Sequence, residues 1–346
     1  MVNHVVKAVA SIEEIVVSGL SRRVEKLVDC NPKSGGVSPK ISPAVPASAV
    51  NPLSLTTTKI DLLFNDTPLG SGSGFILEWA GHYGLVTNWH VVSGRNPLTG
   101  QCHSRTGAIP NRVKFNVALE KTYKSEKALK FHPVDIRLYR DNCLEKPRWV
   151  DDREQDDYRD YVILPLKLSD ALLRRKFTIK SIRGGNVIFD KSDYNNEQVH
   201  YKKTQNVYPS IGRQVFILGY PSGIEPTGVL PIWKGGTIAS EPYSAHFLSE
   251  RQTLDAFLVD GLTRSGMSGA PVIRLVERGE MMTADDGFQV PSPSDQNLLL
   301  GVYAGREGVT KYEADLALGR VWKIGALERL FRRMLDDRVT EITIKP

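Results

Sequence analysis

The sequence predicts an all-β domain of the sandwich or barrel type, with a helical segment near each end of the chain. From about residue 53 onward, short runs rich in β-branched and aromatic residues alternate with Gly, Pro and Asn turn signals. Only residues 318–337 show a convincing helical pattern in that part of the chain. Many short strands with little helix between them favour an antiparallel all-β architecture over an α/β one.

The elements follow in three parts. Residues 1–30 carry apolar side chains at helical intervals and predict a helix. Residues 31–52 are rich in Pro, Ser and Gly and predict a flexible linker. Residues 53–346 form the main domain, and its predicted strands are 57–64, 73–80, 83–89, 112–119, 161–166, 214–220, 235–240, 256–261, 270–276 and 298–305.

Composition limits the class of partner. The 346 residues include 45 Lys and Arg against 39 Asp and Glu, a net charge of +6 spread along the chain. The basic runs are interleaved with apolar residues, which is typical of the solvated faces of amphipathic elements, so no nucleic-acid partner is predicted. No apolar run is long enough to span a membrane, so no membrane partner is predicted either.

Cysteine usage and the N-terminus indicate a reducing compartment. The three cysteines show neither a disulfide framework nor the spacing of a zinc site. The apolar stretch near the N-terminus is interrupted by Glu13 and Glu14, so it does not resemble a secretory signal. A cytoplasmic location is therefore expected.

The segment "TRSGMSGAPVI" (263–273) surrounds Ser268 with residues that have almost no side chain. A serine hydroxyl attacks a carbonyl usefully only when backbone N–H groups stabilise the resulting oxyanion. Gly266 can adopt a positive φ, so its amide and that of Ser268 are the predicted donors. The alternative is a plain turn of small residues before a strand.

The segment "GLVTNWHVVSG" (84–94) places His90 at the end of an apolar strand. It follows the glycine- and serine-rich "GSGSGFIL" (70–77), which allows close backbone packing beneath the histidine. That glycine run is not a phosphate loop, because neither Gly-Lys-Ser/Thr nor a helical pattern follows it. The alternative for His90 is a buried core histidine.

Asp160 opens the apolar run "YVILPL" (161–166), where its carboxylate can accept the second N–H of an imidazole. Asp156 and Asp157 are read as the tip of an acidic loop. His90, Asp160 and Ser268 thus occur in the chain order of the catalytic residues in chymotrypsin-type β-barrels. Serine needs a neutral imidazole to accept its proton, and a carboxylate to orient that imidazole.

Together, "GSGSGFIL", "LVTNWHVV", "RDYVILPL", "VFILGYPSGI", "GTIAS", "GMSGAPV" and "GVYAG" resemble the trypsin-like serine peptidases of the chymotrypsin fold, over about residues 55–325. The bacterial intracellular and HtrA-like branch is the most similar, although too few residues follow Trp322 for a PDZ domain. The resemblance implies a chymotrypsin-like double β-barrel, with barrels at about 53–185 and 205–317 followed by the 318–337 helix. The active site would lie between the barrels, with no cofactor and with protein or peptide substrates.

The sequence also departs from the family pattern. Val91 stands where secreted relatives carry a disulfide cysteine, and Met267 where zymogen-activated relatives carry an aspartate. Activation by removal of a pro-segment is therefore not expected. The resemblance places Leu262 at the floor of the substrate pocket and Ala304 in its wall, which implies an apolar or small P1 residue. Arg306 in the same wall is the alternative, since it would favour an acidic one.

Two other interpretations stay open at this stage. One is a catalytically silent module that keeps the protease fold for binding or scaffolding. The other assigns a role to the N-terminal helix, which is suited to oligomerisation or to docking a partner. A metal site built from His82, His90 and His103 is not predicted, because their spacing matches no common ligand pattern.

Overall fold

The computed structural model describes residues 50–104, 106–123, 126–153, 159–183, 210–226, 228–242, 246–249, 252–283, 288–306, 317–337 and 339–346. The predicted 1–30 helix and nearly all of the 31–52 linker lie outside these residues. The last linker residue, Pro52, begins a short 3₁₀ helix, η3 (Pro52–Leu55), whose first turn is capped by the Asn51 side chain. The description that follows concerns the unit that contains the main domain.

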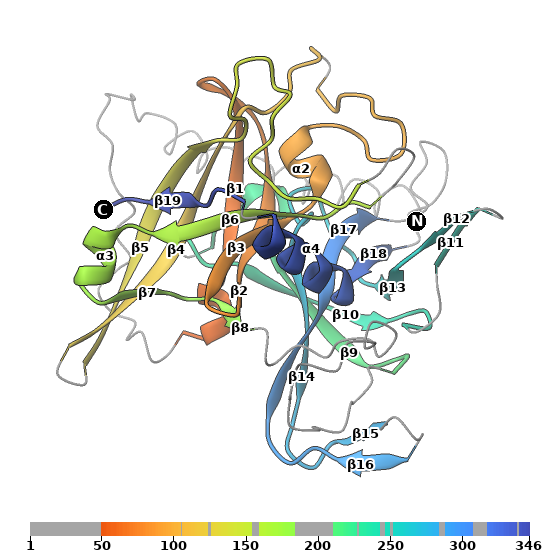
Figure 1. The fold of residues 1–346 in the computed structure, drawn as a ribbon. Coiled ribbons are helices and arrows are strands. Elements are labelled where there is room, and N and C mark those ends of the chain that lie inside the picture. The colour runs from red at the N-terminus through yellow and green to blue at the C-terminus, as the bar shows by residue number, and fades with distance from the viewer. Residues whose placement is uncertain are drawn as a thin grey trace, which may run out of the picture. The chain divides into compact units, whose positions relative to one another are not determined.

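A nine-stranded sheet contains the strands β1 to β8 and the last strand of the chain, β19 (Figure 1). Its path is β19-β6-β3-β2-β1-β4-β5, with β7 added to β4 and β8 added to β2. The strands are β1 (Thr57–Phe64), β2 (Thr67–Trp79), β3 (His82–Thr87), β4 (Arg112–Tyr123), β5 (Glu126–Arg137), β6 (Val162–Leu168), β7 (Phe177–Ile179), β8 (Ile182–Arg183) and β19 (Ile342–Ile344). A bridge between Val150 and Ile163 ties the chain beyond β5 back to β6, so the sheet is barrel-like.

The second sheet is a closed barrel in the order β10-β13-β18-β17-β14-β9. Its strands are β9 (Gln214–Gly219), β10 (Ile232–Ile238), β13 (Ala256–Asp260), β14 (Pro271–Val276), β17 (Gln296–Arg306) and β18 (Leu318–Lys323). Two hairpins stand apart from it, β11 (His246–Ser249) with β12 (Gln252–Leu254), and β15 (Met281–Thr283) with β16 (Gln289–Pro291). Two barrel-like sheets and little helix confirm the predicted chymotrypsin-like, all-β fold class.

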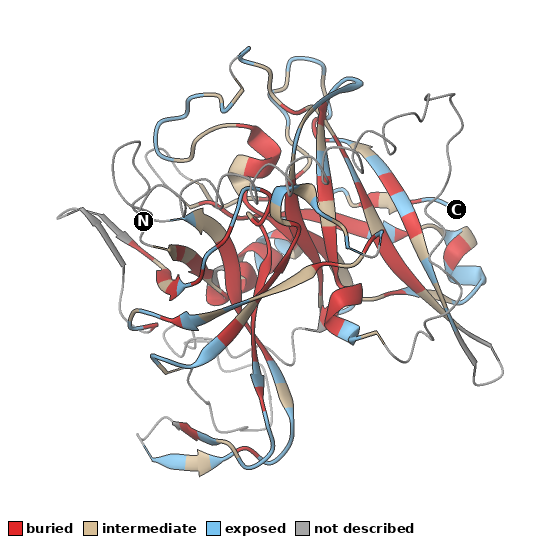
Figure 2. Ribbon diagram, turned by 180° about the vertical axis from the view of Figure 1, so that it is seen from behind, coloured by how far each residue is buried: buried red, intermediate tan, exposed pale blue. Residues whose placement is uncertain are grey.

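Three buried clusters account for this arrangement, and Figure 2 shows burial running along the strands of both sheets. One cluster fills the first sheet, around Ile60, Leu85 and Val113. Another fills the second barrel, around Val215 and Val272. The third lies at the seam, where side chains of both sheets pack together with the C-terminal helix. The two sheets therefore share a hydrophobic core as well as having one each.

The C-terminal helix differs from the prediction. It is α4 (Gly325–Asp336), seven residues shorter at its start than the predicted 318–337 helix. Residues 318–323 instead form β18, which pairs with β13 on one side and β17 on the other. Val321 and Trp322 are buried there, and pairing on both edges outweighs the local helical pattern. The second barrel accordingly extends to Lys323.

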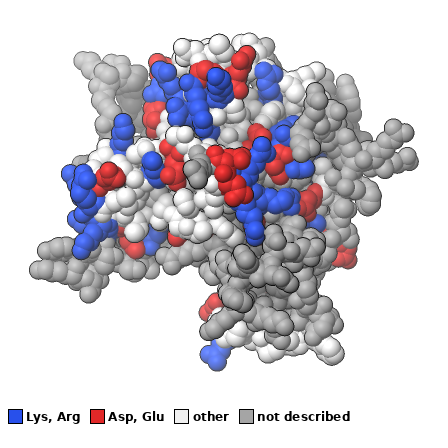
Figure 3. Space-filling model, viewed as in Figure 1, with Lys and Arg blue, Asp and Glu red and all other residues white. Residues whose placement is uncertain are grey.

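The helix α4 packs against the cluster of buried side chains that the two sheets share. Its Phe331 packs so near Gly84 of β3 that a Cβ on that glycine would come within 3.0 Å of the ring. The exposed Arg332 bonds the buried Glu328, and the exposed Arg333 bonds the exposed Asp337, each pair one helical turn apart. Acidic and basic side chains lie interspersed on this face of the molecule (Figure 3). Within the described residues, no helix has the length and apolar character needed to cross a membrane.

Candidate active site

Ser268 lies in the turn that leads into β14, beside a kink in β17. The register between β17 and β18 shifts between Tyr303 and Gly305, so Ala304 is an extra residue in the ladder. Such a bulge re-aims the local backbone. The Ser268 hydroxyl donates a hydrogen bond to the Ala304 carbonyl oxygen, at 3.2 Å.

The two amides predicted to bind an oxyanion belong to Gly266 and Ser268. Gly266 has φ +93°, as predicted from its residue type. The carbonyl of Ser265 accepts a hydrogen bond from the Ser222 amide at 2.6 Å, which orients the Ser265–Gly266 peptide group. Within the described part of the chain, neither the Gly266 nor the Ser268 amide donates to another protein group. Both remain available to a bound ligand.

His90 lies on a short helix, α2 (Trp89–Ser93), and not at the end of an extended strand as the sequence suggested. The strand β3 stops at Thr87, and a left-handed Gly94 ends the helix. A Cβ at Gly94 would come within 2.4 Å of Pro110, so the turn needs this glycine. The imidazole is therefore carried by a helical turn beyond the end of β3 and not by the strand itself.

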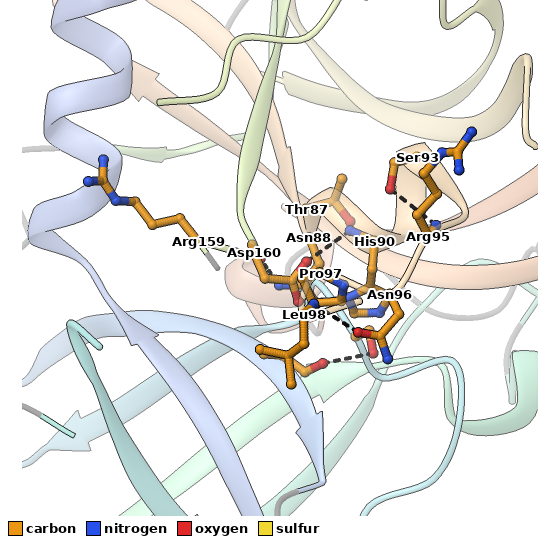
Figure 4. A network of polar contacts seen from close by, with 12 residues as sticks. Thr87, Asn88, His90, Ser93, Arg95, Asn96, Pro97, Leu98, Arg159 and Asp160 are labelled. Carbon is orange, nitrogen blue, oxygen red and sulfur yellow. Dashed lines mark hydrogen bonds and ion pairs between the residues drawn. The ribbon is translucent and has the colours of Figure 1, made fainter. Parts of the chain in front are cut away.

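Asp160 holds His90 through two bonds (Figure 4). Its Oδ2 lies 2.7 Å from Nδ1 of His90, and its Oδ1 accepts the His90 backbone N–H at 2.8 Å. Asp160 is only 3% exposed and lies just before β6. The predicted pairing of this carboxylate with the imidazole is present. Asp156 and Asp157 lie outside the described residues.

Two further side chains fix this pair. Asn88 is fully buried, and its amide nitrogen donates to the Asp160 backbone carbonyl at 2.5 Å. Arg153 donates to the carbonyl of Arg159 at 2.8 Å and to that of Pro97 at 3.1 Å. Its guanidinium also lies over the Trp89 ring, 3.9 Å from the ring centre. The guanidinium therefore links the residues that precede Asp160 and His90.

The Ser268 turn is built against the strands that lead to His90. The Ser73 amide of β2 donates to the Ser268 carbonyl at 2.8 Å, and the Ser73 hydroxyl donates to the Gly266 carbonyl at 2.6 Å. Thr87, three residues before His90, donates to the Ser73 carbonyl at 2.8 Å. A Cβ on Gly269 would lie 2.1 Å from that same carbonyl oxygen. The sheets thus meet in direct contact at the predicted site.

The predicted pocket residues have different positions. Leu262 is 47% exposed, so it does not form the floor of an enclosed pocket; its neighbour Thr263 is the buried residue of that segment. Ala304 is half-buried beside Ser268. Arg306 is exposed at the end of β17. Just before this segment, the Gly261 amide donates a hydrogen bond to the Ala317 carbonyl at 2.8 Å.

Sequence reasoning missed several residues of this region. Ser73, Thr87 and Asn88 are all buried polar residues on or next to strands. Buried polar side chains in predicted strands are unusual and need partners, and that is the signal that singles them out. Tyr303 gave no such signal, since an aromatic residue in a strand is ordinary.

His103 lies edge-on to His90, with 5.7 Å between ring centres. Burial, and then the nearby His90, lower the pKa of His103, and Asp160 opposes this shift. The remaining histidine considered above, His82, bonds Glu341 instead. Among the described residues, no three His, Cys, Asp or Glu side chains are grouped as metal ligands.

A family model described as the trypsin-like peptidase domain matches residues 72–282. A comparison with curated proteins gave no match. The chain is similar to the solved active form of the Rv3671c protease from M. tuberculosis, at 16% identity over 88% of this chain and 92% of that one, with a TM-score of 0.38. It is also similar to the serine endoprotease from Yersinia pestis, at 11% identity over 83% of this chain and 65% of that one, with a TM-score of 0.39.

The family model decides the assignment. Its match covers more than half of the sequence and includes the segments of His90, Asp160 and Ser268. The chain belongs to the trypsin-like peptidase domain family.

Proposed function

We propose that the protein is a serine endopeptidase that hydrolyses peptide bonds in protein substrates, with Ser268 as nucleophile, His90 as general base and Asp160 as the group that orients the base. The observation that carries this proposal is the double contact between Asp160 and His90, at 2.7 and 2.8 Å. A carboxylate on Nδ1 fixes the imidazole tautomer whose Nε2 is free to accept a proton.

In the proposed reaction, the Ser268 hydroxyl leaves the Ala304 carbonyl and turns toward Nε2 of His90. Nε2 accepts the hydroxyl proton as Oγ bonds to the carbonyl carbon of the scissile peptide. The carbonyl oxygen becomes an oxyanion, which the Gly266 and Ser268 amides stabilise. His90 then gives the proton to the leaving amine, and water hydrolyses the acyl-enzyme by the same steps.

The free Gly266 amide favours this enzyme over a catalytically silent binding module. In a collapsed site, the Ser265–Gly266 peptide would be reversed and the Ser265 carbonyl would fill the oxyanion position. Here the Ser265 carbonyl is bonded to the Ser222 amide instead. A preformed pair of donors is worth about 3 kcal/mol or more in transition-state stabilisation, and it has no evident use in a pure binding module.

The proposed location is the cytoplasm. Cys102 and Cys143 are free thiols, and Cys143 is exposed. An exposed free thiol suits a reducing compartment better than an oxidising one.

The test is labelling with a fluorophosphonate probe, which reacts with an activated serine. Wild-type protein should label, and Ser268→Ala should lose all labelling. Ser294→Ala, which changes an exposed serine near β17, should label at the wild-type rate. Folded wild-type protein that never labels, or Ser268→Ala protein that still labels, would overturn the proposal.

A further inference from the structure

The chain beside Ser268 determines where a substrate side chain can go. The Gly269 amide donates to the Tyr303 carbonyl at 2.8 Å, and the Tyr303 amide donates to the Ala270 carbonyl at 2.9 Å. These bonds hold the start of β14 along β17. Among the described residues, the nearest neighbour of a Cβ added to Gly305 would be the Ser268 hydroxyl, at 3.9 Å. Space for a substrate backbone is therefore open beside Ala304 and Gly305.

A carbonyl carbon that Ser268 attacks must come within roughly 3 to 3.5 Å of its hydroxyl oxygen. Its oxygen must also reach the Gly266 and Ser268 amides. With the backbone along Ala304 and Gly305, the side chain of that residue, the P1 residue, is directed between the 263–266 segment and β17. The depth available between these two walls sets the size of side chain that the site accepts.

Tyr303 lies between those walls. It is 1% exposed, and its hydroxyl is hydrogen-bonded to the hydroxyl of Thr263, which is itself 2% exposed. Thr263 belongs to one wall and Tyr303 to the other, so the phenol joins the two walls through its hydroxyl. A long P1 side chain that entered between these two walls would meet this ring.

Gly319 holds the other side of the ring. A Cβ at this position of β18 would lie 2.3 Å from a ring carbon of Tyr303 and 2.8 Å from its hydroxyl oxygen. The ring is thus packed against the β18 backbone while its hydroxyl is bonded to Thr263. A side chain fixed at both ends does not move aside at low cost for a substrate.

We infer that Tyr303 determines specificity by filling the base of the P1 site, so that the enzyme cleaves after small uncharged residues, namely Gly, Ala and Ser. The inference rests on the proposed peptidase function and assigns its substrate class. Of the two P1 preferences considered from the sequence, the inference supports the one for small residues and not the one for acidic residues that Arg306 would give. Arg306 is exposed at the strand end, whereas Tyr303 is buried and its hydroxyl is bonded to Thr263 of the opposite wall.

The test uses two peptidyl phosphonate probes that differ only in their P1 side chain, Ala or Phe, together with cleavage of a peptide mixture. Wild-type protein should react with the Ala probe faster by a factor on the order of 100, since a filled pocket excludes a phenyl group. Tyr303→Val should reduce this ratio at least about tenfold and add cleavage after Leu and Phe. Leu298→Ala, a cavity-forming change in the same strand and core cluster, should keep the wild-type ratio.

The outcomes separate the two proposals. Fluorophosphonate labelling with cleavage chiefly after Phe, Leu, Lys, Arg, Asp or Glu overturns the inference alone. A folded Tyr303→Val protein with the wild-type probe ratio also overturns it. If Tyr303→Val does not fold, the wild-type probe ratio and cleavage profile decide the matter. Wild-type protein that neither labels nor cleaves overturns the peptidase function and this inference with it.

Discussion

The two halves of the site are held in place by different physical means. On the first-sheet side, a buried carboxylate fixes His90, and polar side chains surround it. On the second-barrel side, Ser268 is placed by backbone bonds and by glycines that let the chain approach β2 closely. The first half depends mainly on side-chain hydrogen bonds, and the second mainly on backbone hydrogen bonds and on the small volume of its glycines.

This difference teaches which substitutions each half tolerates. The His90 half depends on charge and hydrogen-bonding pattern, so an isosteric change that removes charge should damage it. The Ser268 half depends on volume and backbone conformation, so a single added methyl group should damage it. Each of the following changes tests one side of that comparison.

The largest expected effect comes from Asp160→Asn. The amide has almost the same shape, but it lacks the charge that favours the Nδ1–H tautomer and stabilises the imidazolium. We expect fluorophosphonate labelling to slow by about 10⁴-fold, as in comparable triads. The thermal unfolding midpoint, measured in parallel, should change far less than the rate. An Asp160→Asn labelling rate within tenfold of the wild-type rate would show that the negative charge of Asp160 is not required for the reactivity of Ser268.

The next effect is expected from Gly269→Ala. Gly269 has φ +88°, and a Cβ there would lie 2.1 Å from the Ser73 carbonyl oxygen and 2.3 Å from the Thr87 hydroxyl. Conformational strain and overlap together should lower the free energy of unfolding by about 3 kcal/mol or more. Denaturant unfolding measures this change.

Gly279→Ala is the matched control for that variant. Gly279 has φ +84°, but a Cβ there meets nothing within 4 Å in the part of the chain that the structure describes. Only the strain of a left-handed alanine remains, which costs about 1 to 2 kcal/mol. Equal losses in the two variants would contradict the idea that close contact between the sheets positions Ser268.

A smaller effect is expected from Ser73→Ala. The Ser73 side chain lies on a strand of the first sheet and bonds the turn that holds Ser268. The Ser73 hydroxyl donates to the Gly266 carbonyl and accepts from the Tyr220 amide at 3.1 Å. Without it, two buried backbone groups lose a partner, at about 1 to 3 kcal/mol in stability. Labelling should also slow, because the Gly266 peptide loses its anchor. Ser71→Ala, at a half-buried position of the same strand, should change both measurements much less.

The same comparison explains what the sequence could predict. The predicted bounds of strands rich in strong β-formers agree with the observed bounds to within one residue in β1 (57–64) and β9 (214–219). The first-sheet strand β5 was missed, because "EKALKFHPVDIR" contains Pro133 and mixed charges. It lies at the edge of the sheet path, where proline is tolerated, and the long pairing with β4 stabilises it. β19 was missed because three residues carry too little pattern.

The candidate site was predictable where the proposed chemistry requires particular residue types. His90, Asp160 and Gly266 stand out because imidazole, carboxylate and a positive-φ glycine have few substitutes in this role. The pocket was not predictable, because its shape depends on the bulge at Ala304 and on the face to which Tyr303 is turned. Neither feature has a local sequence signal, since both arise from pairing with β18.

The smallest expected effect concerns pH and the first-sheet half. Burial, followed by the charge of His90, lowers the pKa of His103 below its ordinary value of 6.5. The unfolded chain then binds a proton at a higher pH than the folded one does. The stability contributed by neutral His103 is thus complete above pH 6.5 and is lost as the pH falls below 6.5 toward the folded pKa.

His103→Gln should therefore flatten the decline of the unfolding midpoint between pH 7 and pH 5, relative to wild type. His82→Gln is a suitable control, since its ring lies beside Glu341 and away from His90. If the unfolding midpoint of His103→Gln falls as steeply as that of wild type, protonation of the buried His103 does not destabilise the fold. The stability of the first-sheet half would then depend less on charge than the contacts between His90 and Asp160 suggest.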